Sequence, residues 1–219
     1  MVANNAMNRE RQLSGVNSYA RELGFDPMDV LAARLDQLGP AGRVSWLDLC
    51  CGSGRALLQA GEQARRTATS ERVALVGVDL VDMFAPRPPG STVTLCCAAL
   101  ETWTPSGSFD LITCVHGLHY VGDKLAVLVR AAGWLTAGGR LVADLDLAAV
   151  RLAGGTAAGR RLRAHLRAAG FGYDARRRRI SCVGPVLVDL PYRYLGADDR
   201  AGTNYTGQPA VDSHYLEHR

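Results

Sequence analysis

Residues 44–54 read VSWLDLCCGSG, an apolar run that breaks abruptly into small residues and a Gly-x-Gly turn. The apolar side chains at 44, 46, 47 and 49 suit a strand buried on both faces of a parallel sheet. Gly52 and Gly54 allow the main chain to turn sharply and to lie close to a ligand. Residues 55–66 continue in a helical pattern. By itself this strand, turn and helix start is weak evidence for a nucleotide or cofactor site, because ordinary connections look similar.

The composition predicts one domain with small appendages. The chain has 219 residues, and 47% of them are hydrophobic. No run approaches the roughly 18 apolar residues of a membrane span, and residues 1–10 contain no apolar core with a cleavage-like site. We therefore expect a soluble, cytoplasmic protein. The formal charge of +4 is a mild excess, and much of the basic charge follows Arg151.

The cysteines predict buried thiols. Six are present, as the adjacent pairs Cys50/Cys51 and Cys96/Cys97 and the singles Cys114 and Cys182. Neither a C-x-x-C pair nor a His/Cys ligand spacing occurs, which favours reduced, buried thiols over a metal site.

A helical cap precedes the first strand. The pattern predicts one helix over residues 8–23 and a second that begins with Asp26 as its N-cap and Pro27 in its first turn. This cap is either a lid across the strand ends or a helical segment packed for stability. We divide the chain into a cap over residues 1–42, a core over 43–196 and a tail over 197–219.

A second buried strand, residues 73–79, ends in an acid. Asp79 lies 25 positions after Gly54 (79 minus 54), close to the spacing at which an acid reaches the ribose hydroxyls of a cofactor on the glycine turn. The alternative is that Asp79 only caps a helix. The combined spacing strengthens the cofactor interpretation of the turn.

Strands and helices are predicted to alternate along the rest of the core, which indicates a parallel sheet with helices on both faces. Strands are expected at 93–97, 109–115 and 140–146, and helices after Asp123 and over 156–169. Two extended runs, 171–183 and 186–194, meet at Gly184-Pro185 and predict a closing hairpin.

These residues resemble the class I S-adenosylmethionine-dependent methyltransferases. DLCCGSG at 48–54 is similar to the family's first motif, and VGVD at 76–79 to its second. FDLI at 109–112 with LHYVGD at 118–123, and LTAGGRLV at 135–142, resemble the regions around the fourth and fifth strands. The resemblance covers about residues 43–146, and four ordered motifs make it specific.

The resemblance implies an α/β, Rossmann-like, doubly wound and mostly parallel sheet of seven strands with a C-terminal antiparallel hairpin, to which the helical pattern adds the N-terminal helical cap. It also implies S-adenosylmethionine as the cofactor. The positions matched to cofactor contacts are Asp48, Cys50, Cys51, Gly52, Ser53, Gly54, Asp79, Leu80, Met83, Ala98, Ala99, Leu100 and Cys114.

Two positions depart from the family pattern. Cys50 stands where the family usually has its first glycine, which is tolerable if Cys50 keeps an ordinary negative φ. Ala98 stands where the family often has an acid that contacts the adenine amine. We therefore expect main-chain groups and apolar faces, with Leu80 and Met83 on one side, to hold adenine.

Two histidines follow the fourth strand, at the edge where open α/β sheets bind ligands. His116 is the leading candidate for a general base, and His119 is the second, with a pocket or cofactor contact as its alternative role. Either ring is also compatible with a hydrogen-bonded structural imidazole. Tyr120 and Cys114 are further candidates to line the site.

The sequence therefore predicts methyl transfer to a small-molecule acceptor, at a phenolic, enolic or activated aromatic O or C atom. Arginines at 160, 161, 163, 167 and 176–179 suit a solvated face, although an RNA or tRNA methyltransferase would use them for phosphates. A cofactor-binding protein, cyclase or lyase without methyl transfer is another alternative. We expect neither nucleic acid nor a membrane as partner; a homodimer is compatible. The tyrosine-containing tail either lines the acceptor pocket or packs on a neighbour.

Overall fold

Seven strands form one sheet in the order β3-β2-β1-β4-β5-β8-β7 in the computed structural model, which describes residues 10–205 and 207–218. The first five run parallel, and β8 is antiparallel to both β5 and β7. This confirms the mostly parallel, Rossmann-like sheet with a C-terminal hairpin. The strands are β1 (Val44–Leu49), β2 (Val73–Asp79), β3 (Thr94–Cys97), β4 (Phe109–Cys114), β5 (Leu135–Asp144), β7 (Gly172–Asp174) and β8 (Arg179–Val183).

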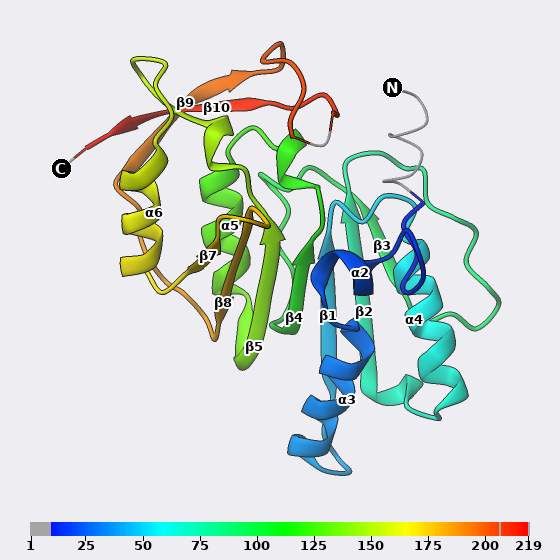
Figure 1. The fold of residues 1–219 in the computed structure, drawn as a ribbon. Helices are drawn as coiled ribbons and strands as arrows, with labels where there is room; N and C mark the ends of the chain where they lie inside the picture. The colour runs from blue at the N-terminus through cyan, green and yellow to red at the C-terminus, as the bar shows by residue number, and fades with distance from the viewer. Residues whose placement is uncertain (1–9, 206, 219) are drawn as a thin grey trace.

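Helices cover both faces of the sheet (Figure 1). One hydrophobic cluster joins the sheet to α3 (Pro27–Leu38) and α4 (Arg55–Arg66). The other joins it to α5 (Lys124–Gly133) and α6 (Gly159–Ala168). The central strand β4 is buried at every position, and its two polar side chains, Asp110 and Thr113, accept hydrogen bonds from the Ser45 amide and the Trp46 ring. Short 3-10 turns occur at Ser70–Arg72, Leu118–Tyr120 and Leu147–Ala149.

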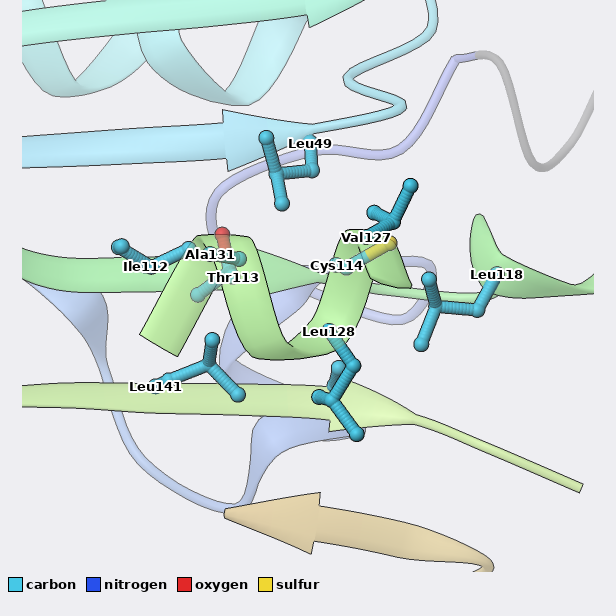
Figure 2. A pocket seen from close by; sticks show the side chains of 10 residues that line it. Leu49, Ile112, Thr113, Cys114, Leu118, Val127, Leu128, Ala131 and Leu141 are labelled. Carbon is cyan, nitrogen blue, oxygen red and sulfur yellow. The ribbon is translucent and has the colours of Figure 1, made fainter. Parts of the chain in front are cut away.

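A small apolar cavity lies inside this core, between the sheet and α5 (Figure 2). Leucine, isoleucine, valine and alanine side chains line most of it, and Thr113 and Cys114 are the exceptions. The Thr113 hydroxyl already donates to Asp48. The cavity is therefore a packing defect of the core, and its lining offers no free polar group that could bind a cofactor.

The predicted helix over residues 8–23 is wrong for most of the part that the structure describes. Only α2 (Tyr19–Leu23) is helical there, because Ser18 caps its first turn and Gly15, with φ of +102°, bends the chain before it. The second helix begins as predicted: the Asp26 side chain accepts from the Met28 amide, and Pro27 follows it.

The predicted hairpin joint at Gly184-Pro185 is also wrong. The turn lies instead at residues 175–178, between β7 and β8. After β8 the chain leaves the sheet, since the Gly184 amide bonds back to Gly139 and Pro185 has no amide to continue the ladder. The next strand, β9 (Tyr192–Asp198), pairs with β10 (Asp212–Glu217), which also pairs with β6 (Val150–Leu152). Figure 1 shows β9 and β10 across the carboxyl ends of the main strands.

The sequence predicted that strands and helices alternate along the rest of the core. The structure shows that they do not alternate everywhere. Residues 80–93, between β2 and β3, form no helix, and neither do residues 98–108 between β3 and β4. Pro86, Pro88 and Pro89 account for the first loop, because proline removes helical hydrogen bonds and restricts its preceding residue. The edge of the sheet at β3 is consequently less covered, and Cys97 there is exposed, contrary to the burial predicted for it.

Candidate active site

The loop after β1 is tied to the end of β2. Cys50, Gly52 and Gly54 all have positive φ, at 57°, 60° and 71°. Asp79 receives two main-chain hydrogen bonds, from the Gly52 amide to Oδ2 at 2.9 Å and from the Val81 amide to Oδ1 at 3.1 Å. These contacts bring the glycine turn and the acid together, as the spacing predicted. Ser53 is buried and its carbonyl accepts from Ala85.

Cys50 does not keep the negative φ expected for it, because the turn requires a left-handed residue at this point. Glycine adopts that conformation freely, whereas another residue loses about 1–2 kcal/mol. The Cys50 side chain is accommodated by Gly117, where a Cβ would lie 2.4 Å from Cys50 Cβ and 2.8 Å from Cys114 Sγ. The cysteines are free thiols, and the predicted burial is confirmed for Cys51, Cys114 and Cys182.

Replacing Gly117 should therefore be costly. We expect Gly117→Ala to lower the free energy of unfolding by about 1–3 kcal/mol, as for other overpacked sites, because Cys50 and Cys114 leave no room for a methyl group. Urea denaturation measures the change. Gly107→Ala is the control, since a Cβ there would meet nothing within 4 Å; an equal loss in both variants would contradict the crowding.

Asp48 is enclosed beneath the turn. Thr113 Oγ1 donates to Oδ1 at 2.6 Å, and the Tyr19 hydroxyl donates to Oδ2 at 2.5 Å. Burial raises the pKa of Asp48 to about 7, although both hydroxyls oppose the rise. Asp48 thus links the turn to β4 and to α2, and its carboxylate lies in the interior, 1% exposed.

Tyr19→Phe should have a pH-dependent effect. The raised pKa means that stability falls as pH rises from about 4 to about 7, since native Asp48 holds its proton longer than the unfolded chain does. Tyr19 offsets part of that loss by bonding the carboxylate. We expect the variant to lose about 1.5–3 kcal/mol at about pH 9 and about 0.5–1.5 kcal/mol at about pH 5, measured by urea denaturation.

Tyr173→Phe provides the matched control for Tyr19→Phe. The Tyr173 hydroxyl donates to the neutral carbonyl of Leu145 at 3.0 Å, so its loss should be similar at both pH values. A pH-independent effect of Tyr19→Phe would contradict the coupling to Asp48.

The residues around the end of β2, which form the candidate cofactor-binding site, fit an adenosyl group. The Asp79 carboxylate has about four acceptor positions, and its two main-chain donors leave some for ribose hydroxyls. Leu80 and Met83, 69% and 56% exposed, offer apolar surface nearby in sequence. The Ala98 amide bonds to the Asp79 carbonyl, which sets the two strand ends side by side.

Three other positions predicted to contact the cofactor are either buried in the core or already hydrogen-bonded within the chain. The Ala99 carbonyl accepts from Trp103, and Leu100 is buried in the cluster under α5. Cys114 is buried at the end of β4. Contact of these three residues with the cofactor stays a prediction.

His116 and His119 lie together beyond β4, with ring centroids 5.9 Å apart and planes 28° from parallel. His116 has φ of +54°, and its amide donates to Asp144 Oδ2 at 3.1 Å. Its Nε2 lies 3.2 Å from Glu22 Oε2, and its Nδ1 lies 3.7 Å from Asp144 Oδ2. His116 is thus bracketed by two carboxylates.

His119 is buried and neutral. Burial lowers its pKa to about 3, and a proton on the neighbouring His116 ring would act in the same direction. Within the described part of the chain, neither of its ring nitrogens has a hydrogen-bond partner. Buried polar atoms are rarely left unpaired, so these nitrogens point to a ligand group or ordered water.

The tail packs onto the histidine loop. The Tyr205 ring lies 5.4 Å from His119 and 6.4 Å from His116 between centroids, and Arg178 lies 4.1 Å above it. Further along, the Val211 amide donates to the His119 carbonyl, and the Tyr120 hydroxyl donates to Gln208.

The sequence interpretation missed Glu22 and Asp144. Asp144 could have been found, because it is an acid near the carboxyl end of a predicted strand, where ligands bind. Glu22 carried no such signal, since its helix is short and precedes the sheet. Its place is fixed by Arg179, which donates to the Glu22 and Leu23 carbonyls.

The profile of a methyltransferase domain family matches residues 16–181. A search of curated proteins finds no match. Many solved structures are similar over part of the fold, among them CalS10, BpumL and DesVI. The SAM-bound amino pentose methyltransferase CalS10 of Micromonospora echinaspora is 23% identical, with a TM-score of 0.37, covering 57% of this chain and 52% of that one.

The plantazolicin methyltransferase BpumL, in complex with SAH and a monoazolic desmethylPZN analog, is 14% identical with a TM-score of 0.46, covering 64% of this chain and 51% of that one. DesVI of Streptomyces venezuelae is 22% identical with a TM-score of 0.39, covering 57% and 50%. This chain thus spans about half the length of these proteins. Among the residues that the structure describes, no helix is long and apolar enough to cross a membrane.

Proposed function

Because this chain belongs to the methyltransferase domain family, we propose that it transfers a methyl group from S-adenosylmethionine to a small-molecule acceptor. The observation that carries this function is the contact of Asp79 with the Gly52 amide, which joins the acid to the glycine turn. When bound, S-adenosylmethionine supplies a methyl group on a sulfonium sulfur. Asp79 would hold its ribose, the Cys50–Gly54 turn its amino-acid part, and Leu80 and Met83 the adenine.

The protein's main contribution is positioning. Holding two reactants in line can lower the barrier by roughly 7–11 kcal/mol. A phenolic, enolic or activated aromatic acceptor also has a proton to lose, for which a general base adds roughly 10²–10⁴ in rate. We assign that role to His116 and propose that the neutral His119 hydrogen-bonds the acceptor.

The rival RNA or tRNA substrate gains no support from residues 177–179 of the arginine cluster. Arg177 pairs with Asp174, Arg178 with Asp146, and Arg179 contacts Asp144. Arginines that already face carboxylates are poorly placed to neutralise phosphates. Ion pairing within this chain accounts for residues 177–179.

The function is tested with purified protein, S-adenosylmethionine and a metabolite extract. We expect a cofactor-dependent product that is heavier by one methylene group, detected by mass spectrometry with a methyl-labelled cofactor. If the labelled methyl group appears only in added RNA and in no metabolite, the small-molecule acceptor is contradicted. Tight cofactor binding without any labelled product would instead favour a protein that does not transfer methyl groups.

A further inference from the structure

One side chain of the N-terminal segment reaches the histidine pair. Glu22 places Oε2 3.2 Å from His116 Nε2, and its Oε1 accepts from Arg11 Nη1 at 2.9 Å. Resting on the proposed role of His116 as the base, we infer that Glu22 is a positioning residue: it holds the neutral His116 ring as the Nε2–H tautomer and leaves Nδ1 to take the acceptor's proton.

The tautomer follows from the chemistry of Glu22. The hydrogen bond with His116 and the charge of Arg11 lower the pKa of Glu22 to about 2 against the effect of burial, so the carboxylate is ionised at neutral pH. An ionised carboxylate only accepts hydrogen bonds, so Nε2 must be the donor. A neutral imidazole has a single N–H, which leaves the lone pair on Nδ1.

The surroundings of Nδ1 suit a proton acceptor. It is a buried atom, and within the described residues it has no hydrogen-bond partner, since Asp144 Oδ2 lies 3.7 Å away, beyond bonding distance. A proton on Nδ1 would make the ring cationic beside that carboxylate, and the opposite charge would stabilise it. Asp144 is itself held in place by the His116 amide and lies 3.6 Å from Arg179 Nε.

The transfer balances with these groups. The acceptor's electron pair forms the bond to the methyl carbon, the carbon–sulfur bond breaks, and its electron pair stays on sulfur. The acceptor's proton passes to Nδ1, and the ring later releases it to water. Throughout, Nε2 keeps its proton on the side of Glu22, in the same way that a carboxylate orients the histidine of a catalytic triad.

The Arg11 contact makes the Glu22→Gln variant a sharp test. Arginine only donates hydrogen bonds, so the carbonyl oxygen of the new side-chain amide must face Arg11, and the amide nitrogen must face His116. That nitrogen also donates, which requires Nε2 to accept. The neutral ring should therefore change to the Nδ1–H tautomer, which has no lone pair on Nδ1.

The experiment records ¹⁵N spectra of the histidine rings in the full chain at neutral to alkaline pH, with His116 assigned by its Asn variant. We expect pyrrole-type Nε2 and pyridine-type Nδ1 signals, and their interchange in Glu22→Gln. With the acceptor found above, kcat should fall at least roughly 100-fold, while calorimetry should show S-adenosylmethionine affinity changed less than about threefold.

Glu62→Gln is the control, because Glu62 pairs with Arg65 on the surface of α4; its spectra and kcat should match the unsubstituted protein. A neutral His116 ring protonated at Nδ1 in the unsubstituted protein, a ring that stays doubly protonated throughout, or an unchanged tautomer in Glu22→Gln would overturn the role of Glu22. None of these outcomes depends on methyl transfer, so failure of the proposed function would appear separately, as absent cofactor binding or absent product.

Discussion

His116→Asn should reduce turnover roughly 100- to 10,000-fold, the usual contribution of a general base, and leave S-adenosylmethionine affinity within a few-fold. Asparagine is chosen because His116 has φ of +54°, a conformation that asparagine tolerates better than most residues. The substitution removes the ring that lies between Glu22 and Asp144. Steady-state kinetics with the identified acceptor and calorimetry with the cofactor measure the two effects.

His165→Asn is the matched control for this loss. His165 lies on α6, and its ring contacts the Tyr192 hydroxyl at 3.0 Å, away from the histidine pair. We expect its turnover to stay close to that of the unsubstituted protein. If His116→Asn keeps full turnover while His119→Asn loses it, the base assignment belongs to His119; if both keep it, neither ring removes a proton in the reaction.

The central sheet could be predicted because its signals are local. The run 44–49 has apolar side chains on both faces, and it leads into a turn with glycines at 52 and 54. The same holds for β2, which was predicted over residues 73–79 and observed there. Burial on both faces leaves a pattern in the sequence that does not depend on any distant partner.

The end of the chain could not be predicted in this way. An extended run such as 186–194 shows that a segment is extended and does not identify its partner. The observed partner of β9 is β10, which begins more than a dozen residues later, and the pairing stands outside the main sheet. A nearby Gly-Pro therefore looked like a hairpin turn, although tertiary pairing placed the turn at residues 175–178.

The candidate site also has residues that local sequence patterns predict and residues that they do not. Asp79, His116 and His119 follow strand ends, so topology alone brings them to one edge of the sheet. Glu22 reaches that edge from a five-residue helix whose position depends on Tyr19 bonding Asp48 and Arg179 bonding the helix carbonyls. Such long-range polar contacts leave no period in the sequence, and they are what places a carboxylate on His116.

Asp79→Ala should weaken S-adenosylmethionine binding roughly 100- to 10,000-fold, because two hydrogen bonds from ribose hydroxyls to a charged acceptor contribute about 1.5–3 kcal/mol each. The variant also frees the Gly52 and Val81 amides, which now donate to the carboxylate. Asp79→Asn separates these effects. One amide oxygen can still accept from the turn, so this variant should keep more of the turn's stability and still lose affinity.

Calorimetry measures the affinity of the unsubstituted protein and of both Asp79 variants for S-adenosylmethionine. Urea denaturation measures how much stability each variant loses at the turn. Asp82→Ala is the control, since it removes an exposed negative charge from the same loop without touching the glycine turn. A loss of affinity equal in Asp79→Ala and Asp82→Ala would mean that loop charge, and not ribose recognition, attracts the cofactor. Among the described residues, Asp79 is the acid that bonds the Gly52 amide. Unchanged affinity in both Asp79 variants would therefore place the ribose elsewhere.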